Sequence, residues 1–206
     1  MFATLLTGAF IAISFSAPPG PVAMETVRRG LRGGFRPALN VQLGSIIGDS
    51  AWFLAALIGL GPLVQIEWVR APLAVAGVLV LLYLGASGIR DAFKTAHTSF
   101  GEDGSVERGA FRSGMAISLA NPLAIGYWLS IGSTLMATGL AGATPAQTAL
   151  FALGFVAGTL AWAFLMAAGV RWSKRLISPT LFRFVNFACG AALLIFGLTL
   201  ASQLLS

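Results

Sequence analysis

Long apolar stretches separated by short polar segments run through the whole chain. Each stretch is bounded by glycine, proline or charged residues, and each has roughly the 20 residues that a helix needs to cross a bilayer. The pattern therefore predicts an all-helical membrane protein with six transmembrane helices. We expect these helices over residues 2–27, 38–60, 72–90, 113–138, 147–170 and 181–205.

Composition supports this class. Hydrophobic residues make up 57% of the 206 residues and charged residues 10%, whereas a soluble domain carries about a quarter charged residues. Six spans use up the chain and leave no stretch for a soluble catalytic domain. The net charge of +6 does not indicate nucleic acid, because the basic residues lie between the apolar stretches. Neither Lys94 nor Lys174 has the glycine spacing of a nucleotide-binding loop.

The basic residues alternate between the connecting segments. Twelve of the thirteen fall in the first, third and fifth connections, and only Arg70 falls in the second. Positive charge marks the cytoplasmic side of a membrane protein, so six spans place both termini in the periplasm. No Lys or Arg precedes the first apolar stretch, which favours a retained span over a cleaved leader.

Two halves of the chain share sequence features. Leu43–Leu54 reads LGSIIGDSAWFL and Leu153–Phe164 reads LGFVAGTLAWAF, at an offset of 110. Shorter matches relate spans one and four and spans three and six. The sequence thus predicts a first three-helix repeat over 1–90, a solvated cytoplasmic connector over 91–112 and a second repeat over 113–206. A unit of three spans must insert its second copy upside down, as in secondary transporters with inverted repeats.

The first span contains a cluster of helix-breaking residues, Pro18, Pro19, Gly20 and Pro21, directly after Ser16. Asn121-Pro122 interrupts the fourth span at the corresponding place. Broken backbone in hydrocarbon leaves polar groups unpaired unless protein or a water-filled cavity satisfies them. We therefore expect helices one and four to be broken at these prolines beside a cavity. A half-helix starting near Val22 would attract an anion such as a carboxylate.

Asp49 is an acidic residue halfway along the second span. A charge at that depth costs roughly 2.5–3.5 kcal/mol on insertion scales, which points to proton relay or recognition of an amino group. A protonated Asp49 bonded to nearby backbone is the structural alternative. The weaker candidates are Glu25, which can simply pair with Arg28 or Arg29 across one helical turn, and Asn40, Gln42, Tyr127 and Asn186.

These motifs together resemble the lysine-exporter (LysE/RhtB) family of amino-acid exporters. The residues that carry the resemblance are Pro18-Pro19-Gly20-Pro21, the glycine-rich residues 30–34, Gly48-Asp49 and Asn121-Pro122. The resemblance implies six spans in two inverted units and proton-driven efflux of amino acids from the bacterial inner membrane. Val22 and Leu123 stand where many relatives have Asn and Lys, which favours a less polar amino acid or analogue.

Three other functions remain open on the residues alone. A metal-ion exporter would need Cys, His or clustered carboxylates, and the spans offer only Asp49 and Cys189. An intramembrane enzyme would need a base beside a nucleophile, and His97 lies in a connecting segment. A non-catalytic assembly subunit fits the Gly-xxx-Gly spacing of Gly44 and Gly48 and of Gly154 and Gly158, which favours close helix packing, but it does not explain the broken span. We therefore expect a transporter without cofactor or resident metal that binds a small molecule and protons, and the small-residue faces permit a homodimer.

Overall fold

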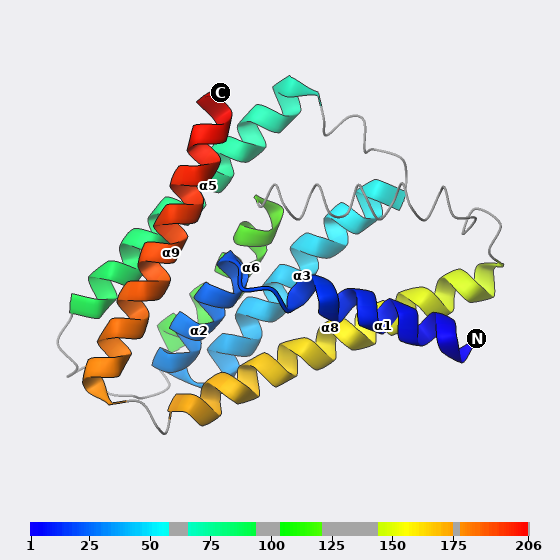
Figure 1. The fold of residues 1–206 in the computed structure, drawn as a ribbon, viewed down its shortest axis with the longest axis horizontal. Coiled ribbons are helices and arrows are strands. Elements are labelled where there is room, and N and C mark those ends of the chain that lie inside the picture. Colours follow the sequence, from blue (N-terminus) through cyan, green and yellow to red (C-terminus); the bar gives the residue numbers. More distant parts are fainter. Residues whose placement is uncertain (58–65, 94–103, 121–143, 175–177, 206) are drawn as a thin grey trace.

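The computed structural model describes residues 1–57, 66–93, 104–120, 144–174 and 178–205, and these form seven α-helices (Figure 1). In chain order they are α1 (Phe2–Ser16), α2 (Pro21–Gly33), α3 (Phe35–Leu57), α5 (Glu67–Phe93), α6 (Gly104–Leu119), α8 (Pro145–Lys174) and α9 (Pro179–Leu205). The predicted all-helical class is confirmed.

Three of these helices, α5, α8 and α9, are long and apolar enough to cross a membrane, and α1 with α2 would make a fourth span if the bent pair is counted as one. The described part of the chain therefore has the helices of a multi-pass membrane protein. Helix α3 covers most of the predicted second span and α6 covers the start of the fourth. Residues 121–138 of the fourth span lie outside the described residues, so the six-span arrangement stays a prediction.

The first predicted span is broken as expected. Helix α1 ends at Ser16, α2 begins at Pro21, and the two axes meet at 76°. Proline is favoured at the first position of a helix because its fixed φ fits and its missing N–H is not needed there. The prediction was wrong about where the segment ends. Helix α2 runs on to Gly33, so Arg28, Arg29 and Arg32 lie on a helix instead of in a loop.

The helices pack in three main pairs, α1 with α8, α3 with α6, and α5 with α9. In Figure 1 the α5–α9 pair runs along one side of the molecule, and α1 lies along α8 on the other. The short helix α2 lies between these pairs and contacts α3, α5, α6, α8 and α9. A half-helix enclosed in this way is shielded from lipid, which allows it to carry polar side chains.

In two of these pairs, α3 with α6 and α1 with α8, glycines set the distance between the two helices. A Cβ placed on Gly48 of α3 would lie 2.7 Å from the Cβ of Ser118 on α6. Likewise, a Cβ on Gly158 of α8 would lie 2.6 Å from the carbonyl oxygen of Ala9 on α1. The Gly-xxx-Gly spacing therefore permits close helix packing in both halves, because small residues let helix backbones approach closely.

We expect Gly154→Ala on α8 to destabilise the folded protein by roughly 1–3 kcal/mol, the usual cost of overpacking a tight interface. The added methyl would overlap the backbone of Leu5 on α1. Gly169→Ala on the same helix is the matched control, because nothing lies within 4 Å of a Cβ there and alanine favours helix. Thermal unfolding in detergent would measure both variants. Equal stability of the two would show that Leu5 can move aside without cost.

The basic ends of several helices gather on one side of the molecule. An ion pair joins Arg32 near the end of α2 to Asp91 near the end of α5. The Arg29 guanidinium lies against Gly109 of α6, and a Cβ on Gly30 would overlap Val170 near the end of α8. The ends of α2, α5 and α8 and the start of α6 therefore lie near one another. Which side of the membrane this is remains a prediction.

Candidate functional site

A cavity of about 470 Å³ lies at the bend between α1 and α2. Its volume is within the range of roughly 300–1,000 Å³ that is usual for small-molecule sites. The sequence pointed to the broken segment Pro18-Pro19-Gly20-Pro21 and to Asp49 of α3, and both line this cavity. The lining residues are Ser14, Phe15, Ser16, Pro18, Pro19, Gly20, Pro21, Val22, Ala23, Gln42, Ser45, Asp49, Ser118 and Phe196.

Helix α3 supplies one polar face of the cavity. Gln42, Ser45 and Asp49 are three and four residues apart, so they lie on the same side of the helix. The Gln42 amide donates from Nε2 to Oγ1 of Thr26 on α2 at 2.9 Å, and Ser45 donates to the carbonyl oxygen of Gln42 at 2.9 Å. The first bond holds the polar face of α3 against α2, whereas the second lies within α3.

Asp49 is bound by a residue from a distant part of the sequence. Ser118 of α6 donates from Oγ to Oδ1 of Asp49 at 2.6 Å. The contact depends on Gly48, because any side chain there would meet Ser118 and push α6 away. A carboxyl group that is half-buried, hydrogen-bonded and open to a cavity can take up a proton or bind an ammonium group.

The first turn of α2 also lines the cavity. The N-cap residue of this helix is Gly20, whose backbone is extended. Because glycine has no side chain, no side-chain hydrogen bond caps the first N–H groups of the helix. Within the helix, the backbone N–H of Met24 bonds to the carbonyl oxygen of Gly20 at 3.0 Å. The N–H groups of the preceding residues have no partner inside a helix, and Val22 and Ala23 line the cavity. Such a helix start favours negative charge, such as a carboxylate.

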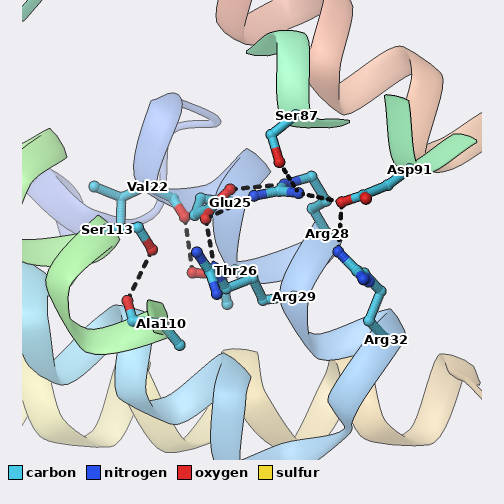
Figure 2. A network of polar contacts seen from close by, with 10 residues as sticks. All are labelled: Val22, Glu25, Thr26, Arg28, Arg29, Arg32, Ser87, Asp91, Ala110 and Ser113. Atoms are coloured by element: carbon cyan, nitrogen blue, oxygen red, sulfur yellow. Dashed lines mark hydrogen bonds and ion pairs between the residues drawn. The ribbon is translucent and has the colours of Figure 1, made fainter. Parts of the chain in front are cut away.

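Glu25 does not line the cavity. Figure 2 shows it in an ion network one turn further along α2. Arg28 donates from Nε and Nη2 to the two carboxylate oxygens of Glu25 at 2.8 and 3.0 Å, and Arg29 donates to Oε1 at 2.6 Å. The pairing of Glu25 with both arginines, one of the two roles considered for it, is therefore present. The Glu25 side chain is completely buried, which sequence reasoning did not anticipate.

The same network joins α2 to α5. Arg28, only 2% exposed, donates from Nη1 to Oδ2 of Asp91 at 2.8 Å, and Arg32 pairs with the same oxygen. Asp91 was expected at the start of a solvated connector, and this was wrong because the residue is buried against α2 (Figure 2). A buried charge needs a partner, and Arg28 is satisfied by a carboxylate on each side.

The remaining predicted candidates fall outside this cavity. Asn40 lies on α3 but is not among the described residues that line it. Asn186 is buried on α9 and donates to the carbonyl oxygen of Phe182 at 2.9 Å. Asn121, Pro122 and Tyr127 lie outside the described residues, so the structure does not describe the predicted second break.

Ser118 and Phe196 line the cavity and were not predicted. Ser118 belongs to the shorter match between spans one and four, in which Ala-Ile-Ser stands at residues 12–14 and again at 116–118, and that match was the one sequence signal that could have pointed to it. Phe196 on α9 carries no such signal, because an aromatic residue in an apolar helix is ordinarily a packing residue. Its exposure to the cavity depends on how α9 packs beside α2 and α5.

Two other features help to define the site. Within the part of the chain that the structure describes, no group of three His, Cys, Asp or Glu residues could hold a metal ion. A second cavity of about 340 Å³ lies between α2 and α8, and its lining includes Leu31, Trp162 and Val170. None of its described lining residues is ionisable. Of these two cavities, the one beside Asp49 is therefore the one whose described lining can bind a charged group.

Comparison with known proteins gives relatives of similar length. The chain is 44% identical to the chemotactic transduction protein ChpE of Pseudomonas aeruginosa, over 94% of this chain and 95% of that protein. It is 29% identical to the threonine efflux protein of Escherichia coli K12, over 82% of each. The threonine efflux protein of Salmonella typhimurium is 27% identical over 82% of each. No solved structure matches the chain.

The family assignment follows from the length of the match. The helices from the end of α1 to the end of α9, the bend and the cavity all lie within the matched region. Proteins of this family are transporters and not enzymes. Over residues 13–204 the chain matches the LysE type translocators, and it belongs to that family.

Proposed function

We propose that this protein is a secondary-active exporter of an amino acid or a close analogue, coupled to the proton gradient. The observation that carries the proposal is one cavity lined both by Asp49, the acidic residue among its described lining residues, and by the first turn of α2, whose N-cap makes no side-chain hydrogen bond. These groups suit a zwitterion, with its ammonium at Asp49 and its carboxylate at the first turn of α2. The names of the threonine efflux relatives support the same substrate class.

Alternating access between two inverted three-helix repeats would move the substrate. In such repeats α1 corresponds to α6, α3 to α8 and α5 to α9. Helix packing supports this arrangement, because the α1–α8 pair then corresponds to the α6–α3 pair and the α5–α9 pair corresponds to itself. Substrate sites in such transporters lie between the repeats, often at a broken helix. Residues of α1, α2 and α3 from one half and of α6 and α9 from the other line the cavity. The charge pattern supports an inner-membrane location with both termini in the periplasm.

A panel of amino acids and analogues offered to inside-out membrane vesicles would test the proposal. Respiration acidifies the interior of such vesicles, so a proton-coupled exporter should accumulate its substrate there. We expect accumulation to depend on the overproduced protein and to disappear when a protonophore collapses the gradient. Accumulation that persists without the gradient would refute proton coupling, and no accumulation of any compound would refute export.

A role in signal transduction is the second candidate. The relative that favours it is the chemotactic transduction protein ChpE. Such a role could use the same cavity for recognition without net transport. Binding of an amino acid to the purified protein, combined with no gradient-dependent accumulation in vesicles, would favour transduction over export.

A further inference from the structure

The cavity has two chemically different walls. Gln42, Ser45, Asp49 and Ser118 provide a polar wall on α3 and α6. Phe15 of α1, Val22 of α2 and Phe196 of α9 provide an apolar wall from three other helices. A zwitterion bound by its ammonium at Asp49 and its carboxylate at the first backbone turn of α2 would turn its side chain toward the apolar surface that remains.

Phe196 is held in place from behind. It packs against an apolar cluster of buried residues from α5, α6 and α9 that includes Leu81, Ile117 and Leu193. One side of the ring therefore contacts the protein core and the other side lines the cavity. Close-packed interiors resist displacement, so the ring presents a fixed wall to a ligand.

Charge on the lining restricts the ligand further. Among the described lining residues, Asp49 is the ionisable one, and none is Lys, Arg or His. A basic amino acid would bring a second positive charge with no second carboxylate to meet it. An acidic amino acid would bring a second carboxylate with no cationic side chain nearby. An unpaired charge removed from water is costly, so a side chain without charge fits best.

We infer that this cavity selects amino acids with uncharged, apolar side chains and that Phe196 is the residue that sets their size. The inference rests on the proposed export function and names its substrate class. It does not follow from the names of the relatives, because the threonine named there carries a hydroxyl group.

The first part of the test uses the wild-type protein. Inside-out vesicles would be offered labelled alanine, leucine, phenylalanine, lysine and glutamate separately, each with and without a protonophore. We expect leucine to accumulate at least about tenfold faster than lysine or glutamate, since a site discriminates strongly when it must bury an unpaired charge. Faster accumulation of lysine or glutamate than of leucine would overturn the inference while leaving export itself intact.

The second part changes the apolar wall. In Phe196→Ala the ring is gone, so the rate for phenylalanine relative to alanine should rise roughly tenfold, which is within the range for adding space to an apolar pocket. Phe196→Leu keeps most of the packing against the core and should shift the ratio in the same direction by less. Ile195→Ala is the matched control, because Ile195 is 63% exposed on the outer side of the same helix.

The outcomes separate the two proposals. An unchanged ratio in folded Phe196→Leu and Phe196→Ala, with uptake continuing, would show that Phe196 does not set side-chain size. A shift of the same size in Ile195→Ala would also overturn that assignment, because this residue does not line the cavity. Failure of the wild-type protein to accumulate alanine, leucine or phenylalanine would overturn the inference, whereas export itself is refuted only if no compound of the wider panel accumulates.

Discussion

Asp49→Asn is expected to insert and fold as the wild-type protein does, yet to lose gradient-driven efflux by roughly ten- to a hundredfold. Asparagine has the same shape as aspartate and keeps an oxygen that can accept the hydrogen bond of Ser118. It can neither bind the coupling proton nor pair with an ammonium group as an ion. Hydrogen bonds to charged groups contribute about 1.5–3 kcal/mol, which corresponds to this range of rates. Initial rates in energised inside-out vesicles would measure the loss.

Two controls accompany this variant. Ser50→Asn changes the exposed residue that follows Asp49 on α3 and should leave transport unchanged. Ser118→Ala removes the hydrogen-bond donor but keeps the carboxyl group, so its effect should be smaller than that of Asp49→Asn. Wild-type efflux from folded Asp49→Asn would mean that the acid has no part in coupling or substrate binding. The cavity would then need another explanation.

Arg28→Met is expected to destabilise the folded protein by roughly 3–5 kcal/mol, the usual cost of removing one partner from a buried ion network. The change leaves Glu25 with Arg29 alone and Asp91 with Arg32 alone. Both carboxylates would stay buried with fewer donors. Chemical denaturation in detergent micelles, monitored by tryptophan fluorescence, would give the free energy of unfolding.

A matched control and a rescue variant show whether this loss comes from unpaired charge. Arg171→Met removes an exposed arginine near the end of α8 and should change stability by less than about 0.5 kcal/mol. The triple variant Glu25→Gln, Arg28→Met and Asp91→Asn removes the carboxylates as well, so it should recover part of the loss. A triple variant less stable than Arg28→Met alone would contradict the proposed cause.

The bend and the acid beside the cavity were predictable because lipid penalises both. Three prolines within four residues, at 18, 19 and 21, remove backbone donors and interrupt a helix, and a carboxyl group in the middle of an apolar stretch needs a polar surrounding. Each feature is local in the sequence. The expectation that both lie beside one cavity needed only the rule that disrupted backbone and charge avoid hydrocarbon.

Contacts between distant residues could not be predicted in the same way. Ser118 reaches Asp49 across 69 residues, and Arg28 reaches Asp91 across 63. The charge pattern assigned the arginines of α2 to a polar connection and so treated them as exposed. Arginine is usually exposed, and only the packing of α2 among the other helices shows that Arg28 is buried. Phe196 illustrates the same limit, because its cavity-facing side depends on tertiary packing.

The dependence of Arg28 on Asp91 also bears on how the chain is assembled during synthesis. Helix α2 leaves the ribosome long before the end of α5 does, because Asp91 follows Arg28 by 63 residues. Until then the Arg28 guanidinium can pair with Glu25, but Asp91, its second carboxylate partner, has not yet been made. Helix α2 therefore gains its second carboxylate partner only after the third apolar stretch has been made, and its contacts with α6, α8 and α9 form later still.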